Sequence, residues 1–239
     1  SVVPDEIIIA DDGSAAPTRR LVQEWESDPV IGSRIRYVWH EDDGFRLAAI
    51  RNRAIAAATG DYIIQIDGDV MLHPRFVEDH IRCARPGFMV KGSRVYLTKE
   101  LTEKLCHREK SVRMHPWSRG IGRCRQKAVR LHWFSNFFRD RFKPHSYWAL
   151  GCNMAFWRAD ALAENGYDES FRNWGHEDSD LFFRMARAGV RKCDLRYAGI
   201  IYHLDHKSGG DGLGNLELLR RRNAENTVVR AVEGIDKYL

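Results

Sequence analysis

Two carboxylates separated by one glycine, Asp67 and Asp69, end a short apolar run in the stretch YIIQIDGDVM. Residues 62–66 have the apolar character of a buried strand, and ligands of α/β sheets bind beyond the carboxyl ends of such strands. Paired carboxylates at that position could bind a divalent cation through hard oxygen ligands. Because Asp-Gly is also common turn chemistry, a metal site and a simple turn are both open on this stretch alone.

Two similar acidic turns precede this one in the chain. Residues 11–13 (DDG) follow an apolar run at 6–10, and residues 42–44 (DDG) follow another at 35–39. Three such turns in succession predict one edge lined with carboxylates, which would repel one another without a cation or a polar ligand. A nucleotide diphosphate bridged by Mn²⁺ or Mg²⁺ meets that requirement, because one carboxylate would bind the metal and others the ribose or the base.

The elements that must position these turns alternate along the chain. Hydrophobic patterns and turn signals predict strands over 6–10, 35–39, 62–66, 87–97, 147–157 and 194–203, and helices over 47–58, 74–84, 178–188 and from 215 onward. This order predicts an α/β fold with a mixed, mostly parallel sheet flanked by helices. We find no repeat and no low-complexity linker, so we expect residues 1–239 to form a single domain.

Composition limits the possible classes of protein. The sequence has no apolar run long enough to cross a bilayer and does not open on a secretory signal. Its five cysteines are irregularly spaced and indicate neither a disulfide scaffold nor a zinc site. These features predict a cytoplasmic protein in a reducing compartment.

Several segments resemble known enzymes. The stretches DDGS (11–14), GFRLAAIRNRAI (44–55) and DGD (67–69) resemble the nucleotide-binding half of GT-A, family 2 type glycosyltransferases, whose D-x-D motif holds a sugar nucleotide through a metal. GCNM (151–154) and NWGHEDSDL (173–181) resemble the C-terminal part of β-1,4-galactosyltransferase and chondroitin polymerase type enzymes. The resemblance implies a Rossmann-like GT-A fold. It also implies inverting, metal-dependent transfer of a sugar from a nucleotide donor, with UDP expected, to a glycan or lipid-linked glycan.

The resemblance also implies roles for single residues. It assigns the nucleotide sugar to Asp11, Asp12, Arg51, Asn52 and Asp67, and the metal to Asp69 and to His203 in YHLDH. It assigns the acceptor to Trp174, Gly175, Glu177 and Asn153, and the catalytic base to Asp178. His206, three residues after His203, is an alternative metal ligand.

The chemistry of the residues gives a separate argument for the acceptor end. In an inverting transfer one carboxylate must take the proton of the acceptor hydroxyl while the metal stabilises the departing diphosphate. Trp174 offers a flat apolar face to a sugar ring, and Asp178 stands at the start of a predicted helix, where backbone amides stabilise a carboxylate. The alternative is that Asp178 or Glu177 is only the N-cap of that helix.

Residues 104–145, called the basic segment below, form an insertion within the expected domain. They contain twelve Lys or Arg and two acidic residues, a net charge of +10, interleaved with aromatic residues as in HWFSNFFRDRF. Such a composition predicts peripheral contact with an anionic surface at the inner face of a membrane. Aromatic residues packed on the domain are an alternative. Nucleic-acid binding is a third alternative and ranks behind both, because no recognised motif accompanies the charge.

The start of the chain departs from the family pattern. Family members begin with a strand of the type S-V-V-x-x-x-Y-N-R and a helix before DDGS, whereas this chain begins a few residues before its first predicted strand. We therefore expect the N-terminal strand of the sheet to be missing. A function of another class also fits, namely a non-catalytic relative that binds glycan, membrane or nucleic acid through the basic segment.

Overall fold

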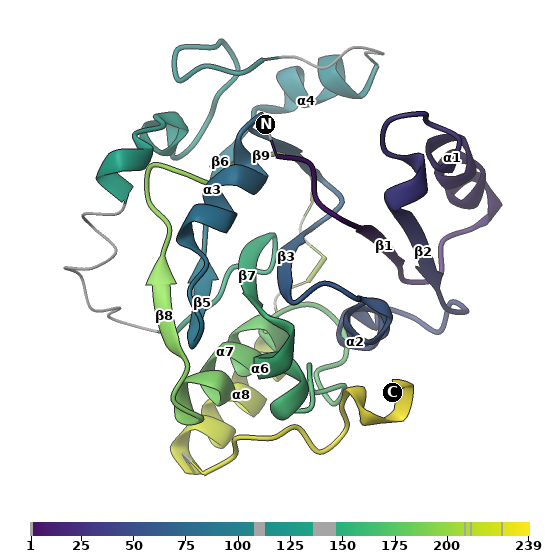
Figure 1. Cartoon of the computed structure of the whole chain (residues 1–239), viewed down its shortest axis with the longest axis vertical. Helices are drawn as coiled ribbons and strands as arrows, with labels where there is room; N and C mark the ends of the chain where they lie inside the picture. Colours follow the sequence, from purple (N-terminus) through teal and green to yellow (C-terminus); the bar gives the residue numbers. More distant parts are fainter. Residues whose placement is uncertain (1, 108–112, 136–146, 208, 211, 226) are drawn as a thin grey trace. The chain divides into compact units, whose positions relative to one another are not determined.

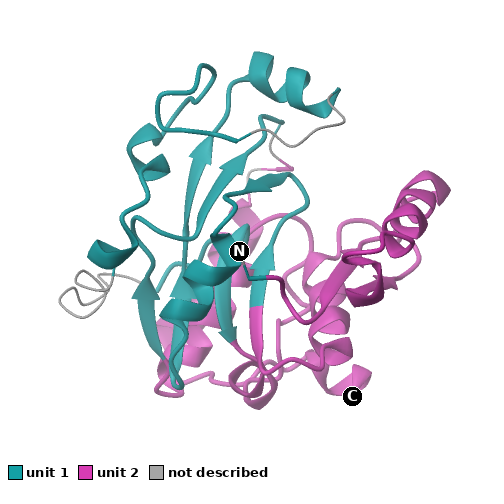
Figure 2. Cartoon of the chain, turned by 45° about the horizontal axis from the view of Figure 1, so that its top comes forward, with its two compact units in different colours: residues 1–2, 64–156, 191–208 teal, residues 3–63, 157–190, 209–239 magenta. Residues whose placement is uncertain are grey.

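The chain has a mixed α/β structure in two compact units. The structure is a computed structural model that describes residues 2–107, 113–135, 147–207, 209–210, 212–225 and 227–239. Unit 1 comprises residues 1–2, 64–156 and 191–208, and unit 2 comprises residues 3–63, 157–190 and 209–239 (Figure 2). Each unit therefore combines segments that are far apart in the sequence.

Unit 2 begins with two strands, β1 (Ile7–Asp11) and β2 (Ile35–Trp39), which pair in parallel along their whole length (Figure 1). Helix α1 (Ala16–Glu26) lies between them in the sequence, and helix α2 (Leu47–Ala57) follows β2. The strands and α2 confirm the sequence prediction to within one residue. Helix α1 was not predicted from the sequence.

Three more helices belong to unit 2: α6 (Arg158–Ala163), α7 (Glu177–Arg187) and α8 (Leu213–Glu225). Arg184 of α7 is fully buried, and its guanidinium pairs with Asp180 at 2.7 Å. The same guanidinium donates to the main-chain oxygens of Glu164 and Gly166, each at 2.7 Å. A buried cation with these partners would be costly to displace, so the contacts fix the orientation of α7 and of the acids at its start.

Unit 1 is built on two sheets, although the ends of β3 and β7 belong to unit 2. One sheet has the order β3 (Tyr62–Ile66), β7 (Asn153–Trp157), β5 (Phe88–Lys91) and β8 (Arg191–Asp194), and the other has the order β4 (Val70–Leu72), β9 (Ile200–His203) and β6 (Ser93–Tyr96). Strand β5 is antiparallel to β7 and parallel to β8, while β9 is antiparallel to β4 and parallel to β6. The predicted mixed α/β class is confirmed, with the strands distributed over three sheets.

One predicted strand, over 87–97, is divided into β5 and β6, which lie in different sheets. Gly92 separates them, and a Cβ atom at this position would lie 2.2 Å from Cγ of Asn153. The Asn153 side chain is fully buried and donates to the main-chain oxygens of Ser93 and Gly199. A tertiary contact therefore accompanies the break, and no local pattern in the sequence reveals it.

Acid should destabilise the fold through His80. This residue lies on α3 (Phe76–Cys83) and is fully buried, with Nε2 on Oδ1 of Asn153 at 3.0 Å and no partner for Nδ1 among the described residues. Burial lowers the pKa of His80 from 6.5 to about 4. Since the unfolded chain binds this proton near pH 6.5 and the folded chain only near pH 4, the free energy of unfolding should fall by up to about 3 kcal/mol across that interval.

Urea titrations at pH 7, 5 and 4 measure this loss of stability. His80→Gln keeps a donor for Asn153 and does not titrate, so this variant should lose correspondingly less stability on acidification. If the variant and the unsubstituted protein lose the same amount of free energy, His80 is not the group responsible.

The basic segment is partly packed and partly exposed. Its Met114, Ile121 and Ala128 are buried in a cluster with Val95 and Leu97. The side chains of Trp117 and Trp133, in contrast, are 83% and 64% exposed. The predicted aromatic residues Phe137, Phe138 and Phe142 lie outside the described residues. In the part of the chain that the structure describes, no helix is both long and apolar enough to cross a membrane.

Candidate active site

Strand pairing in unit 1 brings together three side chains that could hold a metal ion. Asp69 directly precedes β4, and Val70 lies opposite His203, the last residue of β9. The main-chain oxygen of Asp69 also accepts a hydrogen bond from the amide of Leu204 at 2.9 Å. This pairing places the predicted ligands Asp69 and His203 side by side, and the turn after β9 adds His206.

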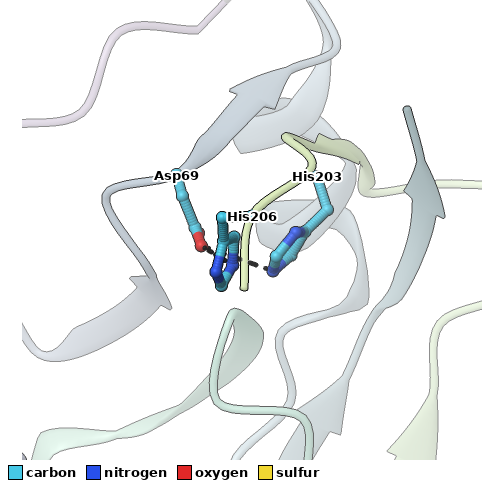
Figure 3. Close-up of side chains that lie close together, drawn as sticks. All are labelled: Asp69, His203 and His206. Carbon is cyan, nitrogen blue, oxygen red and sulfur yellow. Dashed lines mark ion pairs between the residues drawn. The ribbon is translucent and has the colours of Figure 1, made fainter. Parts of the chain in front are cut away.

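The three side chains, called the metal triad below, point toward one another (Figure 3). Oδ2 of Asp69 lies 2.6 Å from Nε2 of His206 and 3.6 Å from Nε2 of His203. The two imidazole rings are stacked, with centroids 5.2 Å apart and planes 24° apart. One ligand atom from each residue lies within 4.8 Å of the others.

Hydrogen bonds to the far side of each ring favour metal binding. Nδ1 of His203 faces the main-chain oxygen of Leu204 at 2.9 Å, and Nδ1 of His206 faces that of Lys207 at 2.7 Å. Because a carbonyl oxygen only accepts, each Nδ1 carries a hydrogen, so in each ring Nε2 is the nitrogen that can present a lone pair to a metal ion beside Asp69.

These lone pairs and the carboxylate repel one another unless a cation or added protons separate them. Oδ1 of Asp69 is buried and has no hydrogen-bond partner among the described residues. A set of two imidazole nitrogens and one carboxylate suits a divalent transition metal such as Mn²⁺. The residues present therefore fit a divalent ion.

Asp67 and Cys152 lie near the triad. Burial raises the pKa of the Cys152 thiol to about 12; Arg94 opposes this rise, and the carboxylates of Asp67 and Asp69 add to it. The thiol is therefore protonated at neutral pH in the absence of an ion. Asp67 is partly exposed beside this cluster, as its predicted nucleotide role requires, and that role stays a prediction.

In unit 2, the two acidic turns at 11–13 and 42–44 touch each other. Gly13 has a φ of 87°, and a Cβ atom there would lie 2.5 Å from Cα of Asp42. Asp12 accepts from the amide of Arg46 at 2.8 Å and lies 2.5 Å from Nε2 of His40. The turns are thus held by close backbone approach and by a carboxylate that already has protein partners.

Asp11 ends β1 and is also bonded within the protein. It accepts from the amide of Ser14 at 2.8 Å and from the hydroxyl of Tyr37 at 2.5 Å. Burial alone would raise the pKa of Asp11, but these hydrogen bonds lower it, so the carboxylate is charged at neutral pH. Burial and Asp11 together raise the pKa of Tyr37 to about 12.

Arg51 and Asn52, two predicted nucleotide ligands, are buried in α2. Arg51 pairs with Glu177 at 2.6 Å. Asn52 donates to the main-chain oxygen of Tyr167 at 2.8 Å and to Glu169 at 3.0 Å, and its Oδ1 accepts from the amide of Tyr167 at 2.7 Å. The geometry gives both side chains a place in the fold of unit 2, and a direct nucleotide contact by either stays a prediction.

The W-G-x-E-D acids lie in the first turn of α7. His176 is the N-cap residue, with a φ of 74° and no side-chain cap, so neither acid has the capping role considered as an alternative. Glu177 is buried, and its Oε2 has no hydrogen-bond partner among the described residues. Burial raises the pKa of Glu177, an effect that Arg51 opposes. Asp178 is partly exposed and accepts from the amide of Ser179 at 2.6 Å.

Trp174 precedes these acids in a turn of unusual backbone conformation. Its side chain is 41% exposed, and its neighbours Asn173 and Gly175 have φ values of 66° and 98°. The side-chain amide of Asn215, on α8, donates to the main-chain oxygens of Arg172 at 2.9 Å and Gly175 at 2.8 Å. Sequence reasoning missed Asn215, because an asparagine near a helix start is ordinary and its partners are distant in sequence.

Two protein-family models match the chain. One, described as glycosyl transferase family 2, matches residues 3–148, and the other, described as the N-terminal domain of galactosyltransferase, matches residues 131–207. The first match contains the acidic turns and Asp69, and the second contains Trp174, the acids of α7 and His203.

Curated relatives are similar over most of this chain. Validoxylamine A glucosyltransferase of Streptomyces hygroscopicus subsp. jinggangensis is 27% identical over 205 residues, which cover 77% of this chain and 44% of the relative. Chondroitin synthase of Escherichia coli is 28% identical over 197 residues, covering 77% of this chain and 28% of the relative. The chain spans less than half the length of these relatives.

Solved structures share the fold at low sequence identity. GalNAc-T7 with UDP, GalNAc and Mn²⁺ superposes with a TM-score of 0.54 and 15% identity, covering 87% of this chain and 39% of that one. The mannosyltransferase PcManGT of Pyrobaculum calidifontis, in complex with GDP-Man and Mn²⁺, superposes with a TM-score of 0.56 and 17% sequence identity. This match covers 92% of this chain and 54% of that one.

Proposed function

The chain belongs to glycosyl transferase family 2 and has the GT-A fold, and from this premise we propose that it is an inverting, metal-dependent glycosyltransferase. It moves a sugar from a nucleotide donor, with UDP as the expected nucleotide, to a glycan or lipid-linked glycan. Similar structures solved with UDP or GDP-Man support the donor class. Relatives that include a chondroitin synthase support a glycan acceptor.

The metal triad is the observation that carries this proposal. Its two lone pairs and one carboxylate, with the buried Oδ1 of Asp69 lacking a partner, fit a divalent ion. An ion bound there would supply positive charge to the departing diphosphate. Asp69, His203 and His206 would hold it, and Asp67 would bind the ribose or the diphosphate.

The acceptor end uses the first turn of α7 and the turn before it. The exposed face of Trp174 would stack on a sugar ring, and the buried Oε2 of Glu177 would accept a hydrogen bond from an acceptor hydroxyl. Asp178 would then take the proton of the attacking hydroxyl. It lies in the first turn of α7, where backbone amides interact favourably with a carboxylate.

Hydrolysis of a UDP-sugar, measured with and without Mn²⁺, tests the proposed function. The full chain should release UDP when Mn²⁺ is present, and the rate should fall by roughly tenfold or more when EDTA removes the ion. UDP release that is equally fast in EDTA would contradict metal dependence. No release from any UDP-sugar would favour a non-catalytic binding function.

We also propose that the basic segment contacts an anionic membrane surface. Trp117 and Trp133 are largely exposed among its arginines, as interfacial aromatic residues would be. Each Lys or Arg near the headgroups adds about 1 kcal/mol of attraction, and the segment carries a net charge of +10. Such contact would hold the enzyme beside a lipid-linked acceptor.

Vesicle co-sedimentation should therefore show binding to anionic vesicles at low salt, and this binding should weaken as salt screens the charges. Replacing both Trp117 and Trp133 by serine should reduce it further. Trp25→Ser is the matched control, since Trp25 is 49% exposed in unit 2, outside the basic segment. If anionic vesicles bind no protein at low salt, or if the control variant loses as much binding as the double variant, the membrane proposal fails.

A further inference from the structure

Two arginines share one aromatic ring beside the metal triad. Tyr96 ends β6 directly opposite His203 in the parallel register, and their ring centroids are 5.7 Å apart. The guanidinium carbon of Arg94 lies 4.7 Å from the centroid of the Tyr96 ring, and that of Arg123 lies 5.3 Å from it. Two positive charges therefore converge next to a metal ligand, all within unit 1.

The basic segment delivers Arg123 to this position through main-chain pairing with β6. The amide of Gly122 donates to the oxygen of Tyr96 at 2.7 Å, and the amide of Tyr96 donates to the oxygen of Arg123 at 3.1 Å. Leu97 and Ile121 form a β-bridge one step further along. Arg123 is exposed, but its backbone is fixed to the strand that carries Tyr96.

Arg94 also contacts Cys152, which lies near the triad. Its Nη1 lies 3.8 Å from Sγ of Cys152, the same thiol whose pKa responds to Asp67 and Asp69. Its guanidinium thus contacts both Cys152 and the Tyr96 ring, which itself lies against His203. Among the described residues, neither Arg94 nor Arg123 forms an ion pair with a carboxylate.

We propose that Arg94 and Arg123, held on Tyr96, form an anion-binding pair for the diphosphate of the nucleotide donor. This inference rests on the proposed function, and it adds two binding residues that the sequence motifs do not contain. Like charges gathered on one ring repel each other, so an anion between them is favourable. A cation above a ring uses the guanidinium face, so N–H groups other than the Arg94 Nη1 group on Cys152 can donate to phosphate oxygens.

Calorimetry of the full chain with inorganic pyrophosphate and Mn²⁺ tests this pair without involving the base or the sugar. Arg94→Gln and Arg123→Gln should each weaken pyrophosphate binding by roughly tenfold or more, as expected for a lost hydrogen bond between charged groups. Tyr96→Phe keeps the ring and should bind normally, whereas Tyr96→Leu should weaken binding. Arg119→Gln, an exposed arginine in the same segment, is the matched control and should bind as the unsubstituted protein does.

Binding of Mn²⁺ alone should be no weaker in the arginine variants, which separates loss of the anion site from loss of the metal site. Normal pyrophosphate binding by both arginine variants, or no pyrophosphate binding by the unsubstituted protein, overturns the proposal. A loss of binding to anionic vesicles without a loss of pyrophosphate binding overturns it as well, because the arginines would then serve lipid phosphates.

Failure of the anion pair is distinguishable from failure of the proposed function. If the unsubstituted protein hydrolyses a UDP-sugar in Mn²⁺ while Arg94→Gln and Arg123→Gln bind pyrophosphate normally, the proposed enzyme activity is supported and the anion-binding pair is wrong. If no UDP-sugar is hydrolysed but pyrophosphate binding needs Arg94 and Arg123, the pair is supported and the catalytic proposal is wrong.

Discussion

Asp69→Ala should abolish Mn²⁺-dependent binding of UDP. The substitution removes the only carboxylate of the described metal triad and leaves two imidazole nitrogens, which bind a hard ion such as Mn²⁺ poorly. Loss of a residue that only supports a ligand already costs roughly 10- to 100-fold in metal affinity, so loss of the carboxylate itself should cost at least that much. Calorimetry with Mn²⁺ and UDP measures the effect.

Variants of the two histidines test the remaining ligands of the metal triad. His203→Ala and His206→Ala should each weaken Mn²⁺ binding, because both Nε2 atoms face Asp69. His115→Ala is a suitable control, since His115 is exposed in the same unit and outside the triad. UDP binding in Mn²⁺ that is unchanged by Asp69→Ala would show that the metal site lies elsewhere.

Asp178→Asn should abolish sugar transfer while leaving donor and metal binding nearly intact. A general base acts on the acceptor hydroxyl and contributes roughly 10²- to 10⁴-fold to the rate, and an amide of the same shape cannot take the proton. The expected result is a large loss of kcat for transfer and little change in the affinity for UDP and Mn²⁺. Steady-state kinetics with a saturating acceptor, together with calorimetry, measures both.

Two comparisons sharpen this test of Asp178. Glu217→Gln removes one exposed acidic charge from α8 and should leave transfer unchanged. Glu177→Gln should raise the acceptor KM more than it lowers kcat, because Glu177 is proposed to bind the acceptor. Near-normal turnover by Asp178→Asn would move the role of the base to Glu177 or Asp180.

The sequence predicted correctly those strands and helices that end at a turn signal in the adjacent residues. Strands β1 and β2 and helices α2 and α7 agree with the prediction to within one residue, because an apolar run or a helical period ends at a clear turn in each case. The break at Gly92 was not predictable, since its reason is the Asn153 side chain, distant in sequence. The predicted strand over 194–203 was wrong in extent, because only β9, at 200–203, continues as a strand after β8 ends at Asp194.

Some candidate site residues could likewise be predicted from local patterns, and others could not. Asp69 and His203 could be proposed from the ends of their strands, and the structure brings them together. The sequence left open whether His203 or His206 is the ligand, because spacing after a strand end does not say which ring faces Asp69. In the structure both rings face it. Asn52 and Asn153 show the opposite limit: their motifs did not reveal that both side chains are buried within the fold, and their ligand roles stay predictions.

Pairing of β4 with β9 joins segments that are distant in the sequence, so we expect the metal triad to form late in folding. Val70 and His203 are far apart in the sequence, so the chain must close a very long loop before Asp69 and His203 meet. A divalent ion would therefore find its ligands assembled in the native state and dispersed in the unfolded chain. We expect bound Mn²⁺ to slow unfolding and to leave the rate of folding nearly unchanged. The ion would then stabilise the β4–β9 pairing kinetically without helping it to form.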